Sequence, residues 1–186
     1  GARGRAEIPA LAERMHRGFA ALASSRVPAI AAIDGWCIGA GIEMIAACDL
    51  RIATKSAKFA LREVKVGIVP DLGGLSRLPH LIGDAWTREL ALLGDDIDAD
   101  TALRIGLVQE VVPHGEQYAR GLELAQRIAA QAPLAVQAAL MNAKIAVRDG
   151  DAAAEATLQP ALGLLAATED ARIGMEAFVT RKPATF

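Results

Sequence analysis

The stretch that decides the fold is Asp34-Gly-Trp-Cys-Ile-Gly-Ala-Gly-Ile-Glu43. The apolar run Pro28–Ile33 before it predicts a short buried strand, and the run Ile42–Cys48 after it predicts a helix. The backbone N–H groups of a glycine-rich strand-to-helix turn can face an anion, or an oxygen that becomes anionic during a reaction. The glycines have an equally good structural interpretation, because they also permit tight packing of a strand against a helix.

Strands and helices alternate outward from this turn, which predicts α/β layering followed by a helical C-terminal region. Further strands or extended pieces are expected at Leu50–Ala53, Lys58–Leu61 and Leu107–Val112. An amphipathic helix is expected before the turn, because apolar residues recur at helical spacing at Ile8, Leu11, Met15, Phe19 and Leu22. The helices expected after the turn begin at Gly73-Gly74 and span Trp86–Leu93, Ala99–Ile105, Gln117–Ala130, Pro133–Val147, Ala152–Ala167 and Asp170–Val179.

Composition excludes several classes of protein. The chain has 186 residues, is 53% hydrophobic and carries a formal net charge of −2, which suits one ordinary domain without a basic footprint for nucleic acid. With three histidines and two cysteines it has little material for a metal site, so we expect none. Cys37 and Cys48 do not form a disulfide framework, which favours a reducing compartment.

The apolar stretch Val27–Leu50 imitates a membrane helix, but it contains three carboxylates that would be costly in hydrocarbon, Asp34, Glu43 and Asp49. We also find no signal peptide pattern before it. The sequence therefore predicts a cytoplasmic protein without a membrane partner.

Three carboxylates stand out as candidates for proton transfer. Glu43 lies in the first turn of the predicted helix, between apolar neighbours, and Glu63 and Asp71 lie on the next segment. If they converge near the glycine turn, burial and mutual repulsion can move the pKa of one of them into a catalytically useful range. The alternative is that they are ordinary surface acids, and the sequence alone does not decide between the two.

Two long segments carry a resemblance to a known family. They are Pro28–Ala53, which includes the glycine turn, and Phe59–Pro79, which includes Glu63 and Asp71. Together with Gly106-Leu-Val and the closing Phe178–Pro183, they resemble the crotonase, or enoyl-CoA hydratase/isomerase, family over effectively the whole chain. The resemblance implies a crotonase-like ββα spiral core, partial here, over residues 1–115. It implies a helical trimerisation region that also contacts coenzyme A over residues 116–186.

The resemblance also implies roles for individual residues. The substrate would be an acyl-CoA thioester whose carbonyl oxygen is held by the turn Gly39, Ala40 and Gly41, with the Ala40 N–H as one donor. Ala40 replaces the family's usual glycine, so the donor survives unless the backbone there needs a positive φ. Glu43 and Glu63 match the catalytic glutamates that hydrate a trans-2-enoyl-CoA to a 3-hydroxyacyl-CoA. Lys182 matches a position that reaches the phosphates of coenzyme A, or is a solvated tail residue.

The resemblance leaves the reaction open. Asp71 matches an aspartate of the Δ3,5-Δ2,4-dienoyl-CoA isomerases, which use it with the glutamate that matches Glu63, whereas Glu43 is typical of hydratases. A homotrimer or dimer of trimers is implied, and no cofactor, since coenzyme A is part of the substrate. The family's N-terminal strands, with the second oxyanion donor, are not in this sequence, which is either an incomplete record of a longer chain, the explanation we favour, or a truncated homologue. A non-catalytic subunit that binds coenzyme A or serves assembly is therefore the alternative from another class.

Overall fold

The computed structural model describes the backbone of residues 2–186 and the side chains of residue 7 and residues 9–186. These residues form two compact units that divide between Gly121 and Leu122. The division falls within α5 (Gln117–Ala129). The side chain of Ile8, which we assigned to the apolar face of the first helix, lies outside the described residues.

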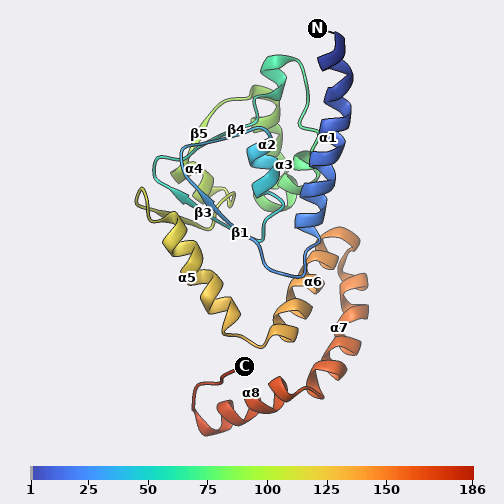
Figure 1. Ribbon diagram of the computed structural model, residues 1–186, viewed down its shortest axis with the longest axis vertical. Coiled ribbons are helices and arrows are strands. Elements are labelled where there is room, and N and C mark those ends of the chain that lie inside the picture. The colour runs from blue at the N-terminus through green and yellow to red at the C-terminus, as the bar shows by residue number, and fades with distance from the viewer. Residues whose placement is uncertain (1) are drawn as a thin grey trace. The chain divides into compact units, whose positions relative to one another are not determined.

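The first unit contains two small sheets (Figure 1). One has three parallel strands in the order β1 (Ile30–Ile33), β3 (Leu50–Thr54) and β6 (Glu110–Val112). In the other, β4 (Lys58–Ala60) pairs parallel with β2 (Trp36–Ile38) and antiparallel with β5 (Ile97–Asp98). The glycine-rich turn that we expected between the strand ending at Ile33 and the helix beginning at Ile42 contains a short strand, β2. That strand is too short to show periodicity, and it exists because Cys37 pairs with the distant Phe59.

The α-helices of the first unit follow the predicted order, and one short 3₁₀-helix was not predicted. They are α1 (Ala2–Ala23), α2 (Ala40–Ile45), the 3₁₀-helix η1 (Glu63–Val66), α3 (Gly74–Leu93) and α4 (Ala99–Arg104). The two helices expected from Gly73-Gly74 and over Trp86–Leu93 both lie in α3, where non-helical backbone at Gly83 (φ 75°, ψ 164°) separates them by a kink. Gly106, in the residue position after the C-cap of α4, has the expected positive φ of 85°.

The core of the first unit lies between its strands and the pair α2 and α3, which contact each other (Figure 1). Its completely buried side chains include Ile42, Phe59, Leu61, Leu78 and Leu107. Burial of one such side chain contributes about 1.5–3 kcal/mol. These contacts hold the start of α2 and the start of α3 at fixed positions, and the candidate site lies at these two starts.

A buried arginine ties this core together. Arg51 on β3 is only 2% exposed, and its guanidinium donates hydrogen bonds to the carbonyl oxygens of Leu107 (2.7 Å) and Cys48 (2.6 Å). Because a buried charge is tolerated only with good partners, these bonds fix the end of α2 against β3 and the approach to β6.

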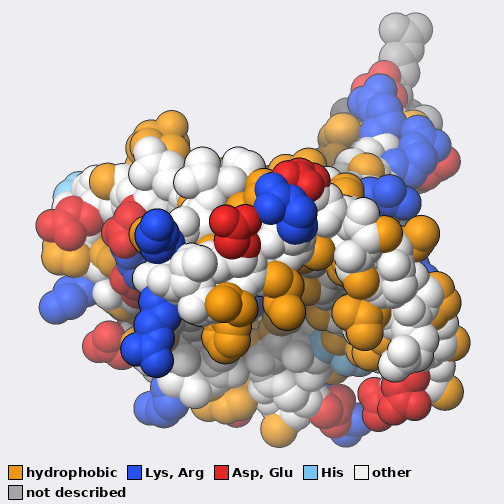
Figure 2. Space-filling view, turned by 90° about the horizontal axis from the view of Figure 1, so that it is seen from below, with side chains coloured by type: hydrophobic (Ala, Val, Ile, Leu, Met, Phe, Trp, Pro, Cys, Tyr) orange, Lys and Arg blue, Asp and Glu red, His pale blue; other side chains and the backbone are white. Residues whose placement is uncertain are grey.

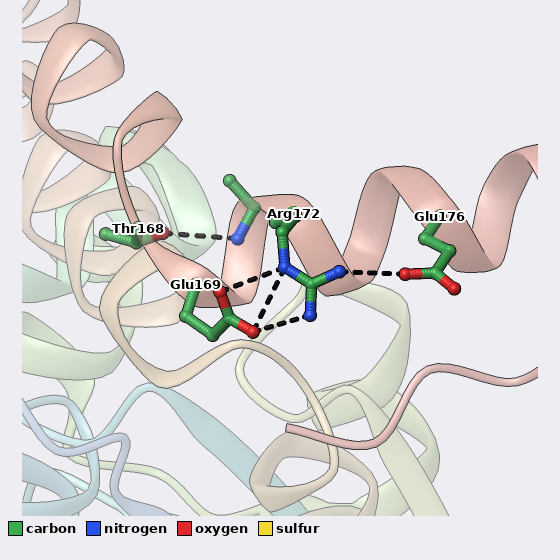
Figure 3. Close-up of polar contacts among 5 residues, drawn as sticks. Thr168, Glu169, Arg172 and Glu176 are labelled. Carbon is green, nitrogen blue, oxygen red and sulfur yellow. Dashed lines mark hydrogen bonds and ion pairs between the residues drawn. The ribbon is translucent and has the colours of Figure 1, made fainter.

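The second unit contains the rest of α5 and three further helices, α6 (Pro133–Asp149), α7 (Asp151–Ala166) and α8 (Glu169–Thr180). Thr168 caps α8 by accepting a hydrogen bond from the Ala171 N–H (3.2 Å), and Arg172 pairs with Glu169 and Glu176 on one side of the helix (Figure 3). Hydrophobic side chains lie exposed among acidic and basic ones on the face seen from below (Figure 2). On α8 the exposed apolar residues are Met175, Phe178 and Val179.

None of the helices in the described part of the chain has the combination of length and apolarity needed to cross a membrane.

Candidate active site

Glu43 is a buried carboxylate held by the backbone of another helix. It lies in the first turn of α2 and is 1% exposed. Its Oε2 accepts hydrogen bonds from the N–H of Leu72 (2.9 Å) and the N–H of Gly74 (2.7 Å), at the start of α3. The Gly73 N-cap of α3 supplies no side-chain acceptor, so the Glu43 carboxylate takes that place. The positive end of α3 therefore faces this carboxylate.

Two glycines make this close approach possible. A Cβ on Gly74 would lie 2.6 Å from Glu43 Cγ and 2.8 Å from Oε2, closer than side chains tolerate. Gly73 has φ 93°, a conformation that favours glycine. The Gly73-Gly74 pair thus turns the chain so that two N–H groups converge on one carboxylate oxygen.

The environment of Glu43 raises the pKa of its carboxyl above the ordinary value of 4.5. Burial is the largest cause, because it disfavours the charged form, and the bonds from Gly74 and Leu72 lower the pKa in part. The negative charges of Glu63 and Asp71 raise it further. A raised pKa lets a carboxyl group hold and release a proton closer to neutral pH.

Glu63 begins η1 and presents its carboxylate to the glycine turn. A Cβ on Gly39 would lie 2.6 Å from Glu63 Oε1, so the carboxylate fills the space that a side chain at position 39 would need. Its Oε2 is buried and has no hydrogen-bond partner among the described residues. A buried carboxylate oxygen without a partner is costly in a structure that serves only stability.

The turn itself presents free donors beside this carboxylate. Gly39 has φ 54° and ψ −117°, and its N–H is held by the Ala60 carbonyl oxygen (2.9 Å). Ala40 opens α2, and Arg181 is the only described non-glycine residue with a positive φ, so alanine fits position 40 without strain. The N–H groups of Ala40 and Gly41 make no hydrogen bond to any described residue, as is usual in a first helical turn.

The remaining predicted site residues are less enclosed. Asp71 is exposed, although its charge reaches Glu43, and its carbonyl oxygen accepts a hydrogen bond from His16 Nδ1 (3.3 Å). Lys182 is exposed and follows α8 in the second unit. The structure therefore brings Glu43, Glu63, Asp71 and the turn 39–41 together within the first unit. The part of the chain that the structure describes holds no cluster of three or more His, Cys, Asp or Glu side chains suited to a metal ion.

Sequence reasoning missed several groups around Glu43. They are the N–H donors of Leu72 and Gly74, the His16 ring against Asp71, and the Arg77 guanidinium, whose Nη1 donates to the Leu72 carbonyl oxygen (3.1 Å). The glycine pair at the start of a long helix was the available signal, because such a helix start leaves N–H groups that need an acceptor.

Comparison with known proteins places this geometry in a family. The family model for enoyl-CoA hydratase/isomerase matches residues 3–186. The chain belongs to the enoyl-CoA hydratase/isomerase family. The resemblance to crotonases and the predicted crotonase-like fold class are therefore confirmed.

Individual relatives share this sequence to different extents. The chain is 50% identical over 112 residues to the mitochondrial Δ(3,5)-Δ(2,4)-dienoyl-CoA isomerase of Dictyostelium discoideum, covering 60% of this chain and 38% of that protein. It is 37% identical over 180 residues to the crotonyl-CoA hydratase of Syntrophomonas wolfei, covering 97% and 68%. The crystal structure of an enoyl-CoA hydratase from Bacillus anthracis is similar, with a TM-score of 0.93, 30% identity and coverage of 97% and 70%. The chain thus spans 38% and 68% of the lengths of the first two relatives.

Proposed function

We propose that this chain carries the paired-carboxylate site of an enzyme that hydrates a trans-2-enoyl-CoA thioester. The observation that carries the proposal is the buried, unpartnered Oε2 of Glu63 beside the glycine turn, in the same unit as the buried Glu43. One carboxylate removes a proton from water as its oxygen adds to the β carbon, and the other delivers a proton to the α carbon. Water is thereby added across the double bond, the carboxylate that took the proton ends protonated, and the group that gave one ends charged, so a proton passes between them or through solvent before the next turnover.

The turn between β2 and α2 supplies the electrostatic part of the mechanism. Negative charge develops on the thioester oxygen between the two proton transfers, and the donor that we propose for it is the N–H of Ala40, which bonds no described residue. Gly39 supports this role, because its conformation directs the chain into α2 and leaves room for Glu63. One such donor contributes about 10²–10³ in rate.

The second candidate is a Δ3,5-Δ2,4-dienoyl-CoA isomerase that uses Glu63 and Asp71. The 50% identity to a protein with that name favours it, over a segment of 112 residues. In this reaction the two carboxylates move protons along a conjugated chain, and no water is added. The exposure of Asp71 and the burial of Glu43 favour the hydratase for the isolated chain.

The substrate and the assembly are part of the same proposal. Coenzyme A is the carrier of the substrate and no separate cofactor is needed, and Lys182 is a candidate contact for its phosphates. A homotrimer or dimer of trimers would cover exposed apolar side chains such as Met175, Phe178 and Val179 on α8. Light scattering on the purified chain tests the assembly, and a monomer at all concentrations would refute it.

The experiment that tests the reaction offers the chain a trans-2-enoyl-CoA and a 3,5-dienoyl-CoA in parallel. Loss of enoyl absorbance with a product heavier by one water supports the hydratase, and growth of 2,4-dienoyl absorbance at unchanged mass supports the isomerase. Glu63→Gln is expected to abolish either signal, and Asp71→Asn only the second. Binding of coenzyme A without turnover would refute both and favour a non-catalytic subunit.

A further inference from the structure

The Leu72–Gly74 turn, whose N–H groups bond Glu43, is also bonded through its carbonyl oxygens. The carbonyl oxygen of Leu72 accepts a hydrogen bond from Arg77 Nη1 (3.1 Å), while the N–H of the same residue donates to Glu43. The carbonyl oxygen of Gly73 accepts from the Ser76 hydroxyl (2.9 Å) and from the Arg77 N–H (3.3 Å). Leu72 and Gly73 are thus fixed through their carbonyl oxygens by residues of the first turn of α3.

The guanidinium also occupies the space beside the turn. A Cβ on Gly73 would lie 2.9 Å from Arg77 Cζ, so the planar group packs against the Gly73 backbone. Arg77 is half-buried and makes no ion pair with any described carboxylate. Other described arginines, such as Arg62 and Arg88, pair with aspartates instead. The side chain of Arg77 therefore serves the backbone of this turn.

We propose that Arg77 is a positioning residue for Glu43, holding the Leu72–Gly74 turn so that its two N–H groups meet the Glu43 carboxylate. Arg77 bonds the carbonyl of the Leu72–Gly73 peptide unit, and the peptide units on either side of it supply the Leu72 and Gly74 N–H groups that meet Glu43. Fixing this central peptide unit therefore fixes the positions of both donors. The proposal rests on the proposed function in one respect, the use of Glu43 as a proton carrier.

The first experiment reads the titration of Glu43 directly and needs no turnover. The chain is labelled with ¹³C at the glutamate side-chain carboxyl carbon, and the Glu43 signal is assigned by its loss in Glu43→Gln. Hydrogen bonds to the charged form lower a carboxyl pKa, so Arg77→Met is expected to move the Glu43 titration to higher pH. Glu63 and Asp71, the other charged groups that act on Glu43, are unchanged in this variant.

Arg88→Met is the matched control, because Arg88 lies on the same helix and pairs with the exposed Asp84. It removes the same charge without touching the turn, and it is expected to leave the Glu43 titration where it is. Equal titration of Glu43 in wild type and folded Arg77→Met would overturn the proposal. Equal shifts in Arg77→Met and Arg88→Met would also overturn it, since the cause would then be net charge.

Arg77→Lys keeps the test decisive if Arg77→Met does not fold. Lysine retains the charge but lacks the planar group that packs on Gly73. Amide exchange at Leu72 and Gly74 is expected to be about tenfold faster in this variant, the factor that corresponds to one net hydrogen bond, with Leu90 on the same helix unchanged. Unchanged exchange at both turn amides refutes the positioning role. Because neither readout needs substrate, absence of turnover contradicts only the proposed function.

Discussion

Glu43 Oε2 lies 2.7 Å from the backbone nitrogen of Gly74, so a carboxylate on α2 caps the N-terminus of α3. The two residues are 31 positions apart in the chain. This relationship couples the stability of the fold to the chemistry of the site, because the same bond organises a helix start and lowers in part the pKa that burial raises.

The free energy of unfolding of the chain is expected to depend on pH through the ionisation of Glu43. Its pKa is raised in the folded state, so the folded chain keeps this proton at pH values where the unfolded chain has released it. The ionised form therefore costs stability, beginning as the pH rises past 4.5, the ordinary value, and fully above the raised pKa. The free energy of unfolding of Glu43→Gln relative to wild type is expected to rise with pH over this window. Urea titrations at several pH values measure it, and a constant or falling difference contradicts the prediction.

Gly74→Ala is expected to displace the Glu43 carboxylate. The new Cβ would lie 2.6 Å from Glu43 Cγ in a buried site, so overpacking should cost about 1–3 kcal/mol in the free energy of unfolding and lower turnover. Gly163→Ala is the matched control, since Gly163 lies within α7 with nothing within 4 Å of its Cβ position. That change should stabilise the helix by about 0.4–1 kcal/mol. Similar thermal denaturation curves for the two variants would argue against the predicted clash.

Gly39→Ala tests the approach of Glu63 to the glycine turn. Both Gly39 (φ 54°) and Gly35 (φ 65°) have positive φ, but only Gly39 has Glu63 Oε1 within 2.6 Å of its Cβ position. Gly35→Ala should cost about 1–2 kcal/mol from backbone strain and leave turnover largely intact. Gly39→Ala should cost more and also reduce turnover, because Glu63 must move. Equal turnover in the two variants, measured with a 2-enoyl-CoA, would mean that the space at Gly39 is not needed for the catalytic position of Glu63.

Arg51→Met tests the buried arginine of the core. The change leaves the carbonyl oxygens of Leu107 and Cys48 without their donor, and the expected loss in the free energy of unfolding is about 3 kcal/mol or more. The exposed Arg88 pairs only with Asp84 on the surface, so Arg88→Met should cost about 1 kcal/mol or less. Chemical denaturation of both variants gives the comparison. A loss of the same small size in both would mean that Arg51 has no special part in the core.

Much of the fold could be predicted because its signals are local. The strands at Ile30–Ile33 and Leu50–Thr54 follow from short apolar runs, and the helices of the second unit follow from long alanine-rich segments. The strands β2 and β5, with three and two residues, could not be predicted, because each exists only through pairing with β4. Pairing of this kind depends on where distant segments meet and leaves no periodicity of its own.

The sequence by itself determined the family, the order of the elements and the residues with chemical potential, Glu43, Glu63 and Asp71. The identity of a side chain and the residues beside it carry that information. Only the tertiary structure decided that Glu43 is buried against the start of α3 and that the Glu63 carboxylate lies beside Gly39. It also decided that Asp71 is exposed and that Arg77 bonds the Leu72–Gly74 turn. The physical reason is that burial and hydrogen-bond partners arise from the packing of α2 against α3, and this packing brings together groups that are about thirty residues apart in the chain.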